Sequence, residues 1–166
     1  MQPLAWYLGR PIWTVRRALY KIYEMRHPDE PWIAQGAVRF CDQNLRRDQA
    51  GLEWGSGRST KWFAKRLARL VSVEFDPEWH QKVTQSLAGM SNVECRLVPL
   101  DHPMELGTGP RYDPVPRYVT VADEFADETL GLVVVDGHYR QACVLRALPK
   151  LKPGGFLLID NTDWLR

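Results

Sequence analysis

Apolar residues recur at helical spacing in the N-terminal part of the chain. Between residues 12 and 22 they follow steps of three and four, and the same spacing returns between residues 33 and 41. The segment HPDEP at 27–31 separates the two stretches, and its prolines favour a break. The pattern predicts two helices ahead of the rest of the fold.

Short, continuous apolar runs follow, as is typical of strands that are buried on both faces. One run leads into residue 54, and the others cover residues 70–73, 93–98, 132–135 and 156–159. Ser59 and Asp76 are suited to begin helices between the first three of these runs. Strands that alternate with helices predict a three-layer α/β fold, with a parallel sheet of about five strands and right-handed crossovers.

Two connections differ from the rest. Pro153 and Gly154, just before the last run, suit the central positions of a type II turn. Residues 99–131 form a long, proline-containing connection, in which residues 118–121 alternate like a short strand. We leave two alternatives for this connection, a lid on the substrate side and a surface insertion.

Composition narrows the class of protein. The chain has 166 residues, 45% hydrophobic and 25% charged, which suits one ordinary globular domain. Its formal net charge of +2 is too small to argue for a nucleic-acid partner, so none is expected. Arg16, Arg17, Lys21 and Arg26 cluster near the N-terminus, and we interpret them as a solvated helix face; the alternative is an RNA or membrane patch.

The three cysteines, Cys41, Cys95 and Cys143, lie far apart and have no metal-binding spacing. We therefore expect buried thiols in a reducing compartment. The N-terminus lacks the charged and apolar regions of a signal peptide, and no run approaches the length of a membrane-spanning helix. These features predict a cytoplasmic protein with no membrane partner.

A glycine turn with a distant acid is the strongest functional signal. Residues 51–60 read GLEWGSGRST, and Gly55 and Gly57 allow backbone geometry and close ligand approach that side chains would block. Glu74 ends the next strand, where a carboxylate can accept hydrogen bonds from both hydroxyls of a ribose. The order of turn, helix and acid predicts a nucleoside-cofactor site. The alternative is a pair of solvated carboxylates at strand ends.

The residues around the turn favour a cationic ligand. A dinucleotide site would place a third glycine where Thr60 stands, and Glu53 would repel a pyrophosphate. S-adenosylmethionine (SAM) carries a sulfonium and an ammonium but no phosphate. The motif Glu53-x-Gly55-x-Gly57 resembles the first motif of the class I SAM-dependent methyltransferases, and the resemblance extends over residues 32–163.

The resemblance implies roles for individual residues. It implies that Glu53, Gly55 and Gly57 surround the methionine and ribose, that Glu74 binds the ribose hydroxyls, and that Phe75 packs on the adenine. Asp101 would reach the adenine amine. Within the same turn and helix start, we expect Ser56, Ser59 and Thr60 to bind the cofactor. Residues 1–48 would form a helical extension covering the site, and residues 49–166 the SAM-binding domain.

Further polar residues follow the fourth and fifth strands, where ligands bind in open parallel sheets. Asp136, His138, Tyr139 and Arg140 follow one strand, and Asp160, Asn161 and Asp163 follow the other. The arrangement is similar to the metal-dependent small-molecule O-methyltransferases. By that resemblance Asp136, Asp160 and Asn161 would bind a divalent metal such as Mg²⁺, which would lower the pKa of an acceptor hydroxyl.

Without a metal, His138 is the leading general base, beside Asp136, because imidazole titrates near neutral pH. The alternative is an ordinary surface histidine. Tyr139 and Arg140 would then position the substrate. Because the sulfonium is an activated donor, alignment of the reacting atoms supplies much of the rate in either case.

The last strand lies close to residue 166, so the antiparallel strand pair that usually ends this fold is not expected here. A fragment, a minimal form and a subunit completed by a partner, including a homodimer, remain open. The function expected is methyl transfer from SAM to a small-molecule acceptor, with a hydroxyl group as the favoured site of methylation. The alternatives are a noncatalytic cofactor-binding or interaction subunit and an NAD-dependent dehydrogenase.

Overall fold

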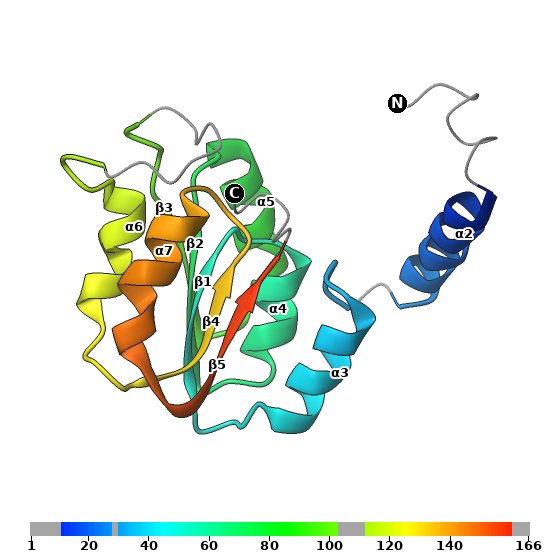
Figure 1. The fold of residues 1–166 in the computed structure, drawn as a ribbon, viewed down its shortest axis with the longest axis horizontal. Helices are drawn as coiled ribbons and strands as arrows, with labels where there is room; N and C mark the ends of the chain where they lie inside the picture. Colours follow the sequence, from blue (N-terminus) through cyan, green and yellow to red (C-terminus); the bar gives the residue numbers. More distant parts are fainter. Residues whose placement is uncertain (1–10, 28–29, 103–111, 161–166) are drawn as a thin grey trace.

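The computed structural model describes residues 11–27, 30–102 and 112–160 (Figure 1). Within them five strands alternate with helices, as expected. The strands are β1 (Ala50–Trp54), β2 (Arg69–Glu74), β3 (Val93–Leu97), β4 (Leu130–Val135) and β5 (Leu151–Ile159). The helices are α2 (Pro11–Arg26), α3 (Gln35–Asn44), α4 (Arg58–Ala64), α5 (Pro77–Ser86), α6 (Arg117–Thr120) and α7 (Arg140–Ala147), with two short 3₁₀ turns, η1 (Val121–Glu124) and η2 (Leu148–Lys150).

The strands form one parallel sheet in the order β3-β2-β1-β4-β5. β1 lies at the centre, pairing with β2 on one side and with β4 on the other. The chain therefore moves outward from β1 in both directions, which creates a topological switch point at the carboxyl ends of β1 and β4. The expected parallel α/β sheet is confirmed.

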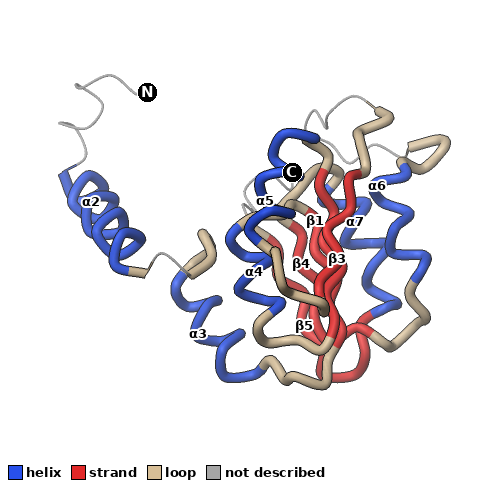
Figure 2. Tube along the Cα trace, turned by 180° about the vertical axis from the view of Figure 1, so that it is seen from behind, coloured by secondary structure: helices blue, strands red, loops and turns tan. Residues whose placement is uncertain are grey.

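Two apolar clusters cover the two faces of the sheet, because successive side chains along a strand point to opposite sides. On β4, Val133 and Val135 join the cluster that packs on α6 and α7, whereas Leu132 and Val134 join the one that packs on α3 and α4. Figure 2 shows these helices on the two sides of the sheet. The result is a three-layer molecule whose strand ends meet at one edge.

Residues 118–121 are helical, so the short strand expected there is wrong. Pro116 precedes α6, and Tyr118 and Val119 are both buried although they are neighbours in sequence. An alternating strand would bury only every second residue. The helix buries both in one apolar cluster, and the Tyr118 hydroxyl lies against Gly137 just after β4, where an added Cβ would collide with it.

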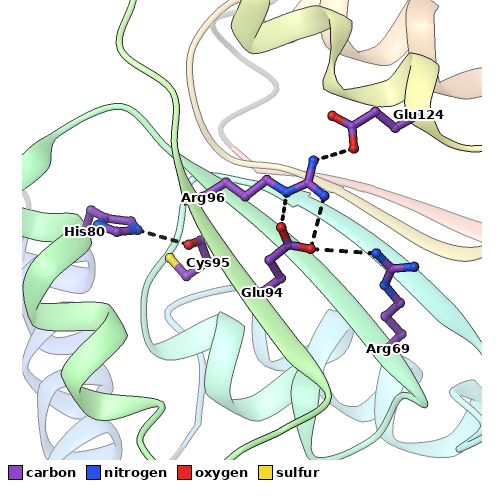
Figure 3. A network of polar contacts seen from close by, with 6 residues as sticks. All are labelled: Arg69, His80, Glu94, Cys95, Arg96 and Glu124. Carbon is purple, nitrogen blue, oxygen red and sulfur yellow. Dashed lines mark hydrogen bonds and ion pairs between the residues drawn. The ribbon is translucent and has the colours of Figure 1, made fainter.

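The exposed edge of the sheet at β3 carries a network of charges (Figure 3). Arg96 binds Glu94 on its own strand and Glu124 of η1, and Glu94 also contacts Arg69 of β2 at 3.7 Å. Charged side chains on an edge strand discourage pairing with other chains. The charges on β3 therefore disfavour the pairing of this edge strand with a strand of another chain.

β5 is irregular at the glycine turn that the sequence predicts, because Pro153 and Gly154 lie within the strand. Gly154 has a φ of +76°, which suits the third position of a type II turn, and the β4–β5 pairing shifts between Leu130 and Leu132. After this shift β5 pairs regularly with β4 from Phe156 to Ile159. The regular part matches the apolar run of the sequence.

Both helices expected ahead of the sheet are present. α3 buries Val38 and Cys41 against the apolar cluster of α4, whereas α2 stands away from the sheet (Figures 1 and 2). None of the helices in the described ranges combines the length and the hydropathy that a membrane crossing would need.

Candidate functional site

The glycine turn lies between the ends of β1 and β4. Gly55 has a φ of +90°, and a Cβ there would lie 2.8 Å from the carbonyl group of Asp136. Only glycine satisfies both conditions. Gly57 differs, because its backbone is extended and no atom lies within 4 Å of the position that a Cβ would occupy. The turn is therefore packed against the protein at Gly55 and open at Gly57.

Glu53 is fully buried beneath this turn. Its carboxyl group accepts hydrogen bonds from three hydroxyl groups, those of Ser59 at 2.7 Å, Thr60 at 2.6 Å and Ser72 at 2.6 Å. Burial raises the pKa of Glu53 from 4.5 to about 7, although the three hydroxyl groups oppose the shift. In this structure Glu53 therefore fixes the start of α4 to β1 and β2.

The raised pKa of Glu53 predicts a pH-dependent stability. A carboxyl group with a higher pKa in the folded state stabilises the fold fully below pH 4.5, and this contribution is lost as the pH rises to about 7. In the parent, the free energy of unfolding should fall by about 3 kcal/mol over this range, and in Glu53→Gln this fall should be absent. Urea unfolding at several pH values would measure it, with the exposed Glu78→Gln as control. Equal pH dependence in the parent and in Glu53→Gln would contradict the assignment.

Glu74 ties the glycine turn to the end of β2. One carboxylate oxygen accepts from the amide and the hydroxyl of Ser56, at 3.1 and 2.8 Å, and the other accepts from the amides of Phe75 and Asp76. Only 3% of the residue is exposed. The structure thus brings Glu74 directly against the turn, with the Ser56 hydroxyl on the carboxylate that the sequence assigns to a ribose.

Trp79 is a part of this site that the sequence analysis did not select. It lies in the first turn of α5, where Asp76 caps the helix by accepting from the Trp79 amide, and its indole N–H donates to the Ser56 carbonyl at 2.7 Å. The sequence Asp-Pro-x-Trp was the available signal, because it places an aromatic donor beside a capped helix start. α5 therefore helps to hold the glycine turn.

Asp136 and Asp160 end the neighbouring strands β4 and β5. The Asp136 amide donates to Trp54 and the Asp160 amide to Val135, so both residues continue the ladder of the sheet. Burial, and then the charge of Asp160, raise the pKa of Asp136 to about 6. The buried Arg140 side chain opposes that shift through a hydrogen bond to Asp136 at 3.2 Å.

The two aspartates lie together, as the metal hypothesis requires, but the third expected ligand, Asn161, lies outside the described residues, as does Asp163. Among residues 11–27, 30–102 and 112–160, no group of three histidine, cysteine or acidic side chains has a metal-binding arrangement. The guanidinium of Arg140 already compensates the charge of Asp136. The described donors on their own do not fit a divalent cation.

His138 and Phe75 meet between the ends of β4 and β2. Their rings are in an edge-to-face contact with centroids 4.4 Å apart. Burial lowers the pKa of His138 below 6.5, and the positive charge of Arg140 adds to this effect. The imidazole is therefore neutral at pH 7 and able to accept a proton.

Asp101 and Tyr139 have partners within the protein. Asp101 accepts from the amide and the guanidinium of Arg117 at the start of α6. Tyr139 is fully buried, and its hydroxyl bonds to the backbone of His102. Both residues join the connection after β3 to the helices on the α6 side of the sheet.

The segment before α3 lies over the start of α4. Arg58, the first residue of α4, donates to the His27 carbonyl at 3.0 Å, and its guanidinium lies 5.1 Å from the centre of the Trp32 ring. Because Arg58 follows Gly57 directly, these contacts bring the N-terminal segment near the glycine turn.

Comparison with known proteins agrees with this geometry at the level of the fold. No protein-family model and no curated protein sequence matches the chain. A Streptococcus mutans protein assigned as a methyltransferase, solved with S-adenosylhomocysteine (SAH), superposes with a TM-score of 0.56 at 12% identity, over 76% of this chain and 72% of the other.

Two further solved structures are similar. An rRNA methylase from Streptococcus thermophilus has a TM-score of 0.54 at 15% identity, over 78% of this chain and 72% of the other. A methyltransferase-like protein from Silicibacter pomeroyi has a TM-score of 0.53 at 22% identity, over 80% and 73%. The chain therefore has the fold of the class I SAM-dependent methyltransferases, as the sequence motif predicts.

Proposed function

We propose that the protein binds SAM at the glycine turn and transfers its methyl group to an acceptor. The observation that carries the proposal is the open backbone at Gly57, next to Ser56, whose amide and hydroxyl donate to the buried carboxylate of Glu74. Four carboxyl groups, those of Glu53, Glu74, Asp136 and Asp160, lie at or next to the carboxyl ends of β1, β2, β4 and β5, at one edge of the sheet. Such an edge suits a cationic sulfonium and disfavours the phosphates of a dinucleotide.

For the cofactor, we propose that Glu74 accepts hydrogen bonds from the ribose hydroxyls after the Ser56 hydroxyl turns away. Phe75, which follows Glu74 and is only partly buried, would contact the adenine. Gly55, Gly57, Ser59 and Thr60 would shape the turn, with Glu53 fixing it from below. We assign Asp101 a role at the far end of the adenine, beyond β3.

We further propose that the extension of residues 1–48 covers the cofactor with its part around His27 and Trp32, and not with α2. The contacts of Arg58 with His27 and Trp32 support this role, because they hold the N-terminal segment next to Gly57. Residues 49–166 then contain the cofactor site itself.

For the chemistry, we propose His138 as the group that takes the acceptor's proton. SAM supplies an electrophilic methyl group on a positively charged sulfur, which leaves with the electron pair of the broken bond. The acceptor's lone pair forms the new bond to carbon, and its proton passes to a nitrogen of His138, which is neutral at pH 7. Arg140 balances Asp136, so this route needs no metal charge there.

The pH dependence of turnover tests the role of His138. Because the neutral base is required, kcat/KM should fall as the pH drops below the lowered pKa of His138, which lies under 6.5. His138→Ala should lower kcat by about 10²-fold or more and remove this acid limb. An acid limb near pH 6 that survives in His138→Ala would belong to Asp136 and would contradict the assignment.

We propose a hydroxyl of a small molecule as the acceptor. The sequence order of Asp136, Asp160 and Asn161 supports this choice, because it is similar to that of the small-molecule O-methyltransferases, although the described part of the site, where Arg140 binds Asp136, gives no support for their metal. RNA is the competing class, because one of the similar structures is an rRNA methylase. Incubation with methyl-labelled SAM, followed by separation of labelled small hydroxyl compounds from labelled RNA, distinguishes the two. Label only in RNA would refute the small-molecule acceptor.

A further inference from the structure

Helix α2 presents an apolar stripe to solvent. Val15, Leu19, Ile22 and Met25 are spaced by four, three and three residues, so they share one side of the helix. Their exposed fractions are 57%, 60%, 42% and 73%. Single exposed apolar residues are ordinary, but four in one row on a helix that stands away from the sheet are not (Figures 1 and 2).

The positive charge of the chain is concentrated in the same region. Residues 1–26 contain five basic residues and one acidic residue, Glu24, for a net charge of +4. Residues 27–166 contain 17 basic and 19 acidic residues, for a net charge of −2. Lys21 and Arg26, within α2, are exposed. The apolar stripe is thus carried by the one strongly basic part of an otherwise slightly acidic protein.

The other side of α2 packs against the protein. Tyr20 and Tyr23 line a small cleft with Ile33 and Val38 at the start of α3, and the Tyr23 ring stacks on His27. Tyr23 also donates a hydrogen bond to Glu30. The tyrosine side of α2 therefore joins the helix to the protein, and the aliphatic stripe remains on the solvent side.

From these observations we propose that α2 binds the surface of an anionic lipid bilayer, with its aliphatic stripe among the acyl chains and its basic residues at the lipid headgroups. A basic amphipathic helix of low overall hydropathy lies in the plane of a membrane and does not cross it. Long basic side chains can extend from such a helix to the headgroups. The slightly acidic remainder of the protein is left in water.

The charge distribution favours this occupant over two others. RNA would satisfy the basic residues but would leave four aliphatic side chains without an apolar partner. A second copy would cover the stripe but would bring two segments of charge +4 together. Only an anionic bilayer matches both the apolar and the basic features.

Co-sedimentation of the full chain with lipid vesicles tests the proposal. The protein should sediment with vesicles of equal phosphatidylcholine and phosphatidylglycerol, and far less with phosphatidylcholine alone. Leu19→Asp/Ile22→Asp should lower the partition coefficient at least about 100-fold, because each substitution removes a buried aliphatic side chain. Lys21→Glu should lower it about fivefold or more on the anionic vesicles.

Leu145→Asp is the matched control, because Leu145 on α7 is also exposed, at 63%. It should sediment like the parent, and all variants should keep the parent's thermal unfolding midpoint. Equal binding of the parent and Leu19→Asp/Ile22→Asp would overturn the proposal. So would dimerisation without lipid that Leu19→Asp/Ile22→Asp abolishes, or binding of a structured RNA together with no binding to anionic vesicles.

Discussion

Gly57→Ala is expected to fold like the parent protein and to bind SAH about 10- to 100-fold more weakly. The backbone at Gly57 is extended, and nothing lies within 4 Å of the added methyl group, so the folded protein accepts it without strain. If SAM approaches the backbone here, the methyl group collides with it, and overpacking of this kind typically costs about 1–3 kcal/mol. Calorimetric titration with SAH and a thermal unfolding curve measure the two effects.

Gly55→Ala is the matched variant, and it is expected to lower the stability of the fold, which Gly57→Ala leaves unchanged. At a φ of +90° and with the Asp136 carbonyl 2.8 Å from its Cβ, an alanine strains the folded protein itself. We expect its unfolding free energy to fall by about 1–3 kcal/mol or more. If Gly57→Ala binds SAH like the parent, the ligand does not approach the turn, and the proposed site is wrong.

Glu74→Gln is expected to weaken SAH binding by about 10- to 100-fold, because hydrogen bonds to a charged group each contribute about 1.5–3 kcal/mol. The carboxamide keeps the size of the side chain and one acceptor oxygen. Its NH₂ group cannot accept from a ribose hydroxyl and faces N–H donors, such as those of Phe75 and Asp76. Calorimetry at several temperatures separates this loss from any loss of folded protein.

The control for Glu74→Gln is Glu78→Gln, which removes the same charge from an exposed position in the first turn of α5. It should bind SAH like the parent. Equal loss in both variants would indicate a general effect of net charge, and unchanged affinity in Glu74→Gln would remove the ribose assignment.

Much of the fold follows from local patterns in the sequence. Continuous apolar runs mark strands buried on both faces, and the glycine turn with Glu74 marks the order of strand, helix and strand at the cofactor edge. The start of α4 at Arg58 lies next to the expected Ser59. These features depend on neighbours in the chain, so the sequence reveals them.

Features that depend on contacts between residues distant in the chain could not be predicted from the sequence. Ser72 of β2 reaches Glu53 of the neighbouring strand β1, and Trp79 reaches Ser56 from α5. Neither contact follows from spacing along the chain. Tyr118 looked like part of a strand because alternation in four residues cannot be told from a short helix, and only its packing against Gly137 decides.

The sequence also predicts only part of the arrangement of His138, Asp136 and Asp160. The sequence places Asp136 and Asp160 at strand ends, and parallel pairing of β4 with β5 brings them together as expected. The bond from Arg140 to Asp136 was not expected, because the sequence analysis treated Arg140 as a substrate-positioning group. That bond changes the local charge balance and makes His138 the stronger candidate for the proton acceptor.

The most direct test of the account is a calorimetric titration of the unmodified protein with SAH and, separately, with NADH. The carboxyl-lined edge and the open Gly57 predict saturable heat with SAH and none with NADH. Binding of NADH together with no heat from SAH would contradict the proposed cofactor site.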